Sequence, residues 1–335
     1  MNHHDVVDVI TGARLHFGLL CGTPESGWIF GGVGMMVRQP GWHLQLRRTS
    51  VPLEIRTTDP VTREKIQRTL QQWDDGKNPL EHGVCIQVIS ESPWHCGFGA
   101  GTQLALGLVG GLDMLLQSQR SGNIMQRARQ IGRASRSVVG TAGFARGGFI
   151  VDPGQPIDGS RDRAPQHFTL PDEWRFVLVR PCHVRGLSGE PERQYFERQQ
   201  TMADATVACL AGIIEKRLVP AIRSRDFSGF AEALGDYGHE AGRFYAPEQG
   251  DVFADPRMSL LVHRLKHLGV RGCAQSSWGP GICIPAESDA DAGQVVRQIS
   301  GFVDAEQLDV MVTEPRNYGA TIRMAAPETG GHHWL

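Results

Sequence analysis

The glycine loop, residues 96–103, carries the strongest local signal for chemistry. It reads CGFGAGTQ and joins a short apolar segment to a long periodic one. Its glycines let the backbone turn tightly, and the amides after them would open a helix. Such amides, together with the positive end of the helix dipole, suit a phosphate or pyrophosphate. The candidate anion-binding residues are Gly97, Gly99, Ala100, Gly101, Thr102 and Gln103.

The loop fits neither of two common nucleotide-binding patterns. It has no Gly-Lys-Ser/Thr, as a Walker A sequence would, and its glycine spacing is not that of a dinucleotide fingerprint. The alternative is a tight turn into a buried helix. Three further glycine clusters favour the anion site, because several short clusters between regular elements indicate backbone that approaches something closely. They cover residues 31–34, 140–154 and 269–281.

Composition excludes several classes of protein. The 335 residues hold 34 basic and 36 acidic side chains, so no basic field predicts nucleic-acid binding and no acidic tail predicts disorder. Seven cysteines, an odd number, fit a reducing compartment better than a disulfide framework. No apolar run has the length of a spanning helix, and residues 1–10 show no leader pattern. We therefore expect a cytoplasmic protein without membrane contact.

Hydrophobic periodicity predicts mixed elements around the glycine loop. The stretch from residue 153 to 171 is rich in Pro, Asp, Gly and Ser and is interpreted as an interdomain linker. Strands and helices alternate without a strict βαβ rhythm, which favours an α+β fold. Strands are expected at 42–47, 84–89, 147–152, 174–179, 273–275, 281–284 and 308–313. Helices are expected at 61–73, 102–117, 123–133, 192–218, 226–240, 256–268 and 289–300.

Several blocks together resemble one family. The glycine loop with its flanks, PWHCGFGAGTQLALG, resembles the phosphate loop of the GHMP superfamily of small-molecule kinases. The match narrows to the β-ribofuranosylaminobenzene (or β-ribofuranosylphenol) 5′-phosphate synthases, because further blocks follow in the expected order over residues 14–280. These blocks are Arg14–Leu19 (RLHFGL), Gly31–Gly34 (GGVG), Gly147–Asp152 (GGFIVD) and Gln275–Pro280 (QSSWGP).

The resemblance implies a two-domain GHMP kinase-like fold. Residues 1–168 would form an N-terminal domain like the second domain of a ribosomal small-subunit protein, with the glycine loop inside it. Residues 169–335 would form a ferredoxin-like C-terminal domain. The active site would lie in the cleft between the domains, and a homodimer is a reasonable expectation for the superfamily.

The resemblance also implies a reaction. Phosphoribosyl pyrophosphate and 4-hydroxybenzoate or 4-aminobenzoate would give a ribosylated product, pyrophosphate and carbon dioxide, in tetrahydromethanopterin biosynthesis. No base is needed at the attacking ring carbon, because carbon dioxide leaves where a proton otherwise would. The needs are leaving-group stabilisation, exclusion of water and alignment of the ring. Magnesium is the expected cofactor.

Roles follow for the remaining candidates. Arg14 and His16 would grip a phosphate or the benzoate carboxylate, and Ser137 and Thr141 would donate to anionic oxygens. Asp152 is the candidate magnesium ligand, although an Asp-Pro at a strand end is also a common turn former. The turn residues would contact the 5′-phosphate, with Trp278 either stacked on a ring or anchoring a hairpin corner. These turn residues are Gln275, Ser276, Ser277, Trp278 and Gly279.

One departure bears on the choice of reaction. GHMP kinases often carry an Asp in the third sequence block of the superfamily. The corresponding residues here, 135–141, read SRSVVGT and include no carboxylate. This absence favours the synthase over an ATP-dependent kinase of a small hydroxylated metabolite, which remains the alternative. A non-catalytic ligand-binding relative is a third possibility. The arginines Arg127, Arg129, Arg133 and Arg136 are expected on a solvated helix face.

Overall fold

The computed structural model describes most of the chain. Its described residues are 6–22, 28–73, 83–118, 123–156, 163–184, 186, 194–195, 198, 201–301 and 307–325. Among them no helix combines the length and the apolar character needed to cross a membrane.

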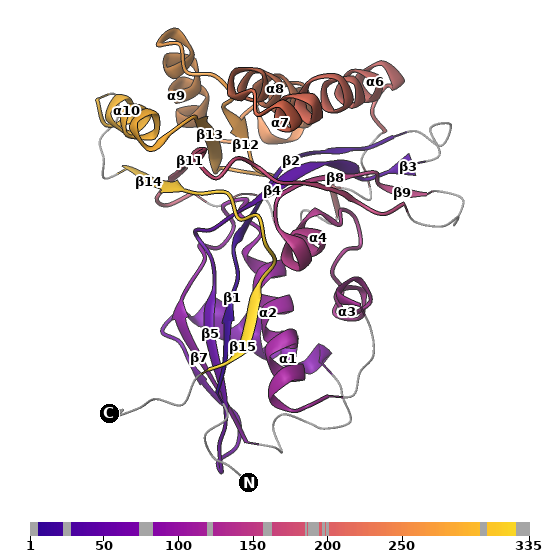
Figure 1. The fold of residues 1–335 in the computed structure, drawn as a ribbon, viewed down its shortest axis with the longest axis vertical. Helices are drawn as coiled ribbons and strands as arrows, with labels where there is room; N and C mark the ends of the chain where they lie inside the picture. The colour runs from indigo at the N-terminus through magenta and orange to yellow at the C-terminus, as the bar shows by residue number, and fades with distance from the viewer. Residues whose placement is uncertain are drawn as a thin grey trace.

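The first sheet forms one end of the molecule (Figure 1). Its strands lie in the order β15 (Thr321–Met324), β1 (Val6–Ile10), β5 (His43–Arg48), β7 (Val84–Ser90) and β6 (Glu54–Arg56). Every pair is antiparallel except β6 with β7. Two helices, α1 (Pro60–Gln72) and α2 (Ala100–Leu115), share a core with this sheet. The apolar period of α2 buries Leu104, Leu108, Leu112 and Leu115 there.

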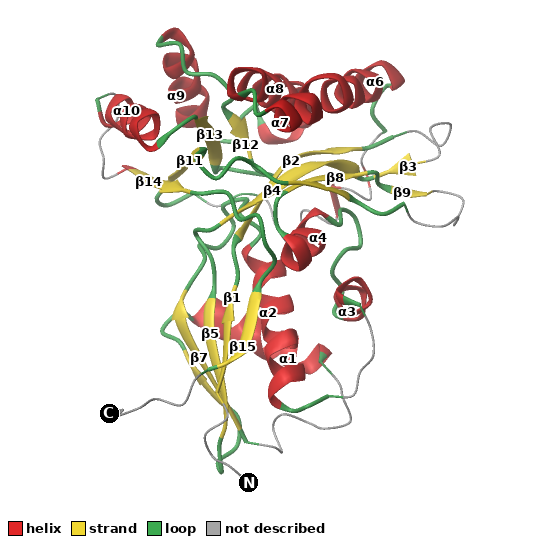
Figure 2. Ribbon diagram, viewed as in Figure 1, coloured by secondary structure: helices red, strands yellow, loops and turns green. Residues whose placement is uncertain are grey.

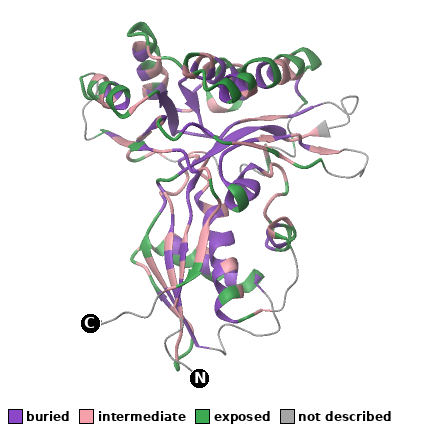
Figure 3. Cartoon of the chain, viewed as in Figure 1, coloured by how far each residue is buried: buried purple, intermediate pink, exposed green. Residues whose placement is uncertain are grey.

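The second sheet lies in the middle of the molecule, as Figure 2 shows. Its order is β10 (Gln166–Phe168), β8 (Phe149–Asp152), β4 (Gly31–Val37) and β2 (Ala13–Leu20). Helix α4 (Val139–Arg146) packs on one face, and the long helix α8 (Phe227–Gln249) packs on the other. Because both faces are covered, β4 is buried along its whole length (Figure 3).

The third sheet belongs to the C-terminal half. Its order is β12 (Ala274–Gln275), β13 (Ile282–Ala286), β11 (Arg175–Pro181) and β14 (Leu308–Thr313), all antiparallel. Helices α9 (Pro256–His267) and α10 (Asp289–Ser300) share its core. The remaining described elements are β3 (Trp28–Ile29), β9 (Gln155–Pro156), α3 (Ile124–Gln130), α6 (Asp204–Ile213), a π-helical turn (Ile214–Leu218) and α7 (Val219–Ser224).

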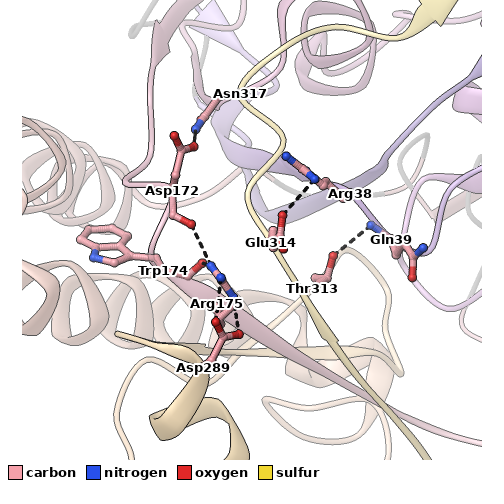
Figure 4. A network of polar contacts seen from close by, with 9 residues as sticks. All are labelled: Arg38, Gln39, Asp172, Trp174, Arg175, Asp289, Thr313, Glu314 and Asn317. Carbon is pink, nitrogen blue, oxygen red and sulfur yellow. Dashed lines mark hydrogen bonds and ion pairs between the residues drawn. The ribbon is translucent and has the colours of Figure 1, made fainter.

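Polar contacts fix the segment that returns from the third sheet to the first (Figure 4). The backbone amide of Gln39 donates to the Thr313 hydroxyl at 2.9 Å, and Arg38 pairs with Glu314 at 3.1 Å. The Asn317 side chain then donates to Asp172 at 2.9 Å. Beyond it, β15 pairs with β1, so the last described strand lies in the sheet of the N-terminal half. The predicted division of the chain into two domains at residue 168 stays a proposal.

The expected α+β class is confirmed, and most predicted elements lie within two or three residues of their predicted bounds. Residues 153–171 are not a structureless linker, however, because they contain β9 and β10, which pair with β3 and β8. Residues 157–162 lie outside the described residues, as do positions 192, 193, 196, 197, 199 and 200 of the predicted helix at 192–218. The later part of that helix is confirmed by α6 and the π-helical turn. Helix α8 continues nine residues past its predicted end at 240.

Candidate active site

Two adjoining cavities form a cleft at the start of α2. The larger, of about 780 Å³, is lined by α1, the glycine loop and residues 131–136. The smaller, of about 180 Å³, is lined by β2, α8 and the turn after β12. Residues that line both include Arg14, Thr102, Arg133, Arg136, Ser277 and Trp278. A molecule that filled both cavities would therefore pass these side chains.

The glycine loop turns into α2 as its sequence predicts. Gly97 and Gly99 have φ angles of 84° and 72°, in the left-handed region that side chains other than glycine rarely adopt. The first intrahelical bonds run from the Thr102 and Gln103 amides to the Gly99 carbonyl, at 3.1 and 3.2 Å. The helix begins without a capping side chain or an acidic residue in its first turn. Its electropositive end therefore faces the larger cavity.

Two arginines flank this helix end. A Cβ built on Gly99 would lie 3.2 Å from Arg14 Nε, and one built on Gly101 would lie 3.6 Å from an Arg133 guanidinium nitrogen. The Arg14 amide also donates to the Phe98 carbonyl at 3.0 Å, which ties β2 to the loop. An anion on the helix end would thus have a guanidinium on either side, a strong arrangement for phosphate oxygens.

Ser276 was predicted to bind a phosphate, but its hydroxyl instead connects three segments of the chain. Its hydroxyl donates to the Gly97 carbonyl at 2.7 Å and accepts from the His16 amide at 3.0 Å. The side chain is 0% exposed and lines neither cavity. Its role is to hold the glycine loop against β2 and the turn after β12.

The other residues of the turn differ in their access to the cleft. Gln275 lines the smaller cavity, but its side-chain oxygen accepts from the Ala254 amide at 2.7 Å. Gly279 lines the larger cavity, and its amide donates within the turn to the Ser276 carbonyl. Ser277 faces both cavities. Of the predicted phosphate contacts in this turn, Ser277 is the best placed.

Trp278 anchors the turn after β12, and its stacking on a ring of a bound molecule stays a prediction. Its ring packs edge-on against Tyr195 and Tyr245, with centroid separations of 4.6 and 5.1 Å, which anchors the turn. The same side chain lines both cavities, so it also forms their common wall. Aromatic pairs of this geometry hold their rings in place.

His16, Ser137 and Asp152 form a chain of hydrogen bonds beside the smaller cavity. The Gly18 amide donates to His16 Nδ1 at 3.3 Å, so Nε2 carries the proton and donates to the Ser137 hydroxyl at 3.0 Å. Ser137 in turn donates to Asp152 at 2.9 Å. Burial, reinforced by Arg14, lowers the pKa of His16 from 6.5 to about 3, so the ring is neutral.

Ser137, Thr141 and Gln103 do not have the roles that the sequence predicted for them. The Ser137 proton is directed at Asp152 and not at an anion in the cleft. Thr141 and Gln103 are each 1% exposed, and neither lines a cavity. Gln103 donates instead to the Gly140 carbonyl at 2.9 Å, which joins α2 to α4. Both side chains point into the interior because their helices pack on each other.

Comparisons with known proteins identify relatives that span nearly the whole chain. The β-ribofuranosylphenol 5′-phosphate synthase of Methanothermobacter thermautotrophicus is 25% identical, over 94% of this chain and 98% of its own. The synthase of the same name from Archaeoglobus fulgidus is also 25% identical, over the same shares. The chain is thus similar over nearly its whole length to the β-ribofuranosylphenol 5′-phosphate synthases. No family model matches it.

Solved structures show that this chain has the GHMP kinase fold. Homoserine kinase from Cytophaga hutchinsonii superposes with a TM-score of 0.65 over 96% of this chain and 99% of its own, at 16% identity. Mevalonate pyrophosphate decarboxylase from Streptococcus pyogenes gives 0.63 over 94% and 98%, at 12% identity. The expected GHMP kinase-like fold is confirmed, and so is the expected similarity to the β-ribofuranosylphenol 5′-phosphate synthases.

Asp152 does not fit the predicted role of a magnesium ligand. Its carboxylate accepts from Ser137, from the Val138 amide at 2.8 Å and from the Gly154 amide at 3.0 Å, and the residue is 3% exposed. Nowhere in the described part of the chain do three or more His, Cys, Asp or Glu side chains gather as they do in a metal site built from protein ligands alone. Magnesium stays a prediction, with no protein ligand assigned to it.

A carboxylate does lie beside residues 135–141, although their own sequence has none. Although residues 135–141 hold no carboxylate, the fold brings Asp152 against Ser137 and Val138 from the neighbouring strand β8. Asp152 lines neither cavity, and no described residue lining either one is acidic. The described cleft therefore presents no carboxylate base to a hydroxyl acceptor.

Sequence reasoning missed several residues that line the cleft. Arg133 and Arg136 follow the end of α3 and line both cavities, contrary to the expected solvated helix face. Arg127 is not on a solvated face either, because its side chain is buried and pairs with Asp113 at 2.6 Å. The sequence did contain a signal that Arg133 and Arg136 lie in a loop, since the helical period stops before Gly132. Other missed lining residues include Phe17, Leu19, Lys65, Arg68, Tyr245 and Val252.

Proposed function

We propose that this chain catalyses decarboxylating phosphoribosyl transfer from phosphoribosyl pyrophosphate to 4-hydroxybenzoate or 4-aminobenzoate. The homology to enzymes named as β-ribofuranosylphenol 5′-phosphate synthases supports the product class. The single observation that carries the proposal is the open end of α2 with a guanidinium on either side, from Arg14 and Arg133. This site suits a pyrophosphate group better than a neutral ligand.

The larger cavity would hold the donor. As the bond from C1 of the ribose to the pyrophosphate breaks, negative charge grows on the departing oxygen. Preorganised amides and guanidinium groups stabilise such charge most when they need no rearrangement. Gly99 and Gly101 bring the start of α2 close to Arg14 and Arg133, so these groups already stand together; a Cβ on Gly99 would come within 2.9 Å of the Arg14 side chain.

The smaller cavity would hold the aromatic acceptor. Its lining includes the apolar or aromatic side chains of Phe17, Leu19, Tyr245 and Trp278, which suit a benzene ring. Arg14 lies where this cavity joins the larger one, in a position to meet the benzoate carboxylate. The ring carbon that bears the carboxylate would then point toward C1 of the donor.

The bonding changes balance without a catalytic base. The ring carbon forms a bond to C1 while the bond from C1 to the pyrophosphate oxygen breaks. The bond to the carboxylate then breaks, its electron pair restores the aromatic ring, and carbon dioxide leaves. Since that carbon loses no proton, the described cleft, whose lining has no acidic residue, is chemically sufficient. The chain's own residues bind both anions, align the ring and exclude water.

Release of pyrophosphate tests the proposal. The purified protein is incubated with phosphoribosyl pyrophosphate and magnesium, with 4-hydroxybenzoate or 4-aminobenzoate supplied separately, and free pyrophosphate is measured. We expect release that needs both substrates, and the faster acceptor would be the natural one. Formation of ADP from ATP and a small alcohol, with no acceptor-dependent pyrophosphate, would favour the kinase instead. A cytoplasmic location and a homodimer remain further proposals.

A further inference from the structure

One face of α1 forms the far wall of the larger cavity. Lys65, Arg68, Thr69 and Gln72 all line it, at the spacing of i, i+3, i+4 and i+7 that places side chains on one side of a helix. The opposite side of α1 is fixed, because Ile66 and Leu70 are buried in the core with α2. The two cations are therefore presented to the cavity by a rigid element.

Neither cation has a partner among the described residues. Lys65 and Arg68 form no ion pair and no side-chain hydrogen bond there, whereas the nearby Arg63 donates to the Ile55 and Thr57 carbonyls at 2.8 and 2.9 Å. Arg56 likewise pairs with Glu54 at 2.7 Å. Within the described chain, Lys65 and Arg68 are thus available to an anion in the cavity.

Trp94 fixes the distance between this wall and the start of α2. Its indole nitrogen donates to the Asp59 carboxylate at 3.1 Å and to the Thr62 hydroxyl at 2.9 Å, both at the beginning of α1. Its ring lies 3.6 Å from the position of a Cβ built on Gly101. The same cavity consequently has cations on two different walls, Arg14 and Arg133 beside the start of α2 and Lys65 and Arg68 on α1.

We propose that Lys65 and Arg68 form a second anion subsite, which holds the 5′-phosphate of the pentose donor. The inference rests on the proposed function, in which the donor carries a pyrophosphate on C1 and a phosphate on C5. With the pyrophosphate at α2, the 5′-phosphate needs cations elsewhere in the same cavity. A nucleoside triphosphate carries its charge at one end only and has no use for two such regions. Among the earlier candidates in the turn after β12, Ser276 is buried and engaged, and Ser277 lines the cleft but carries no charge.

The test compares two ligands that each represent one end of the donor. Binding of ribose 5-phosphate and of pyrophosphate is measured by calorimetry for the wild-type protein and for the Lys65→Gln/Arg68→Gln double variant. We expect ribose 5-phosphate to bind about 10- to 100-fold more weakly to the variant, because charge-assisted hydrogen bonds are lost. Pyrophosphate binding should change less than about threefold, since screening limits the effect of distant charges.

Matched variants guard against a general effect of charge or folding. Lys266→Gln removes an exposed lysine of α9 that lines neither cavity, and it should leave both affinities unchanged. Arg133→Gln should show the reverse pattern, with pyrophosphate weakened and ribose 5-phosphate nearly unaffected. Equal melting temperatures of the wild type and the double variant confirm that both are folded.

Three results would overturn the subsite: no binding of ribose 5-phosphate to the wild type, no loss in the double variant, or equal losses for both ligands. Failure of the proposed function is separable from these. If ribose 5-phosphate binding depends on Lys65 and Arg68 but no acceptor releases pyrophosphate from the full donor, the subsite stands and the proposed reaction is wrong.

Discussion

At the scale of single residues, His16 is held neutral by its surroundings. Its Nδ1 accepts from the Gly18 amide, its Nε2 donates to Ser137, and Asp152 completes the chain. The sequence pointed to His16 and Ser137 as ligands of anions, because such residues beside glycines often bind them. That they would instead satisfy each other depends on β2, β8 and α4 meeting in space, which no local pattern contains.

The buried neutral ring makes a testable contribution to pH dependence. The pKa of His16 is about 3 in the folded protein and near 6.5 when unfolded, so the unfolded chain binds the extra proton between these values. The free energy of unfolding should therefore fall as the pH drops through that window, by up to about 1.4 kcal/mol per pH unit. Urea unfolding near pH 4 and near pH 7, for wild type and His16→Asn, measures this slope. Identical slopes in both proteins would contradict the assignment.

Ser276 provides a second prediction at this scale. Ser276→Ala leaves the buried Gly97 carbonyl without its donor, so we expect a loss of about 1 to 3 kcal/mol in the free energy of unfolding. We also expect a higher KM for the donor, because the glycine loop loses its connection to β2. Ser300→Ala, which removes an exposed hydroxyl on α10 that donates to Val296, should do neither. Unchanged stability with weaker phosphate binding would restore the direct-ligand role.

At the scale of elements, the amphipathic helices and the alternating strands were predictable, whereas the glycine-rich strands were not. Strands β2 and β4 contain Gly18, Gly32 and Gly34, residues that disfavour strands in isolation. They form here because the backbone must approach its neighbours, as at Gly18, where a Cβ would lie 2.5 Å from the Ala241 side chain of α8. The glycine loop was predictable because its signal lies within one short stretch.

The turn into α2 is tested by Gly99→Ala. A methyl group there would lie 2.9 Å from Arg14 Cβ and would occupy a φ of 72°, so we expect kcat/KM to fall by more than about 100-fold while the protein stays folded. Gly269→Ala is the matched control, because its φ is 85° and nothing lies within 4 Å of the added atom. Similar activity losses in both variants would mean that backbone strain, and not crowding at Arg14, is responsible.

At the scale of the whole molecule, the cleft is assembled from segments far apart in sequence. Arg14 comes from β2, Lys65 from α1, Arg133 from the loop after α3, and Ser277 and Trp278 from the turn after β12. Order-preserving motifs allowed the family and the position of the glycine loop to be predicted. Arg14 and Trp278 were predicted singly, but their meeting with Arg133 and Tyr245 could not be, because that proximity arises only when the second sheet packs against α8.

Loss of the carboxyl carbon is the event that defines the proposed reaction, so its direct measurement tests the account best. The protein is supplied with 4-hydroxybenzoate labelled at the carboxyl carbon, with phosphoribosyl pyrophosphate and magnesium, and released labelled carbon dioxide is counted. The account predicts release that requires the donor and equals the pyrophosphate formed. Pyrophosphate formed without labelled carbon dioxide, or no release with either benzoate, would contradict decarboxylating transfer in this cleft.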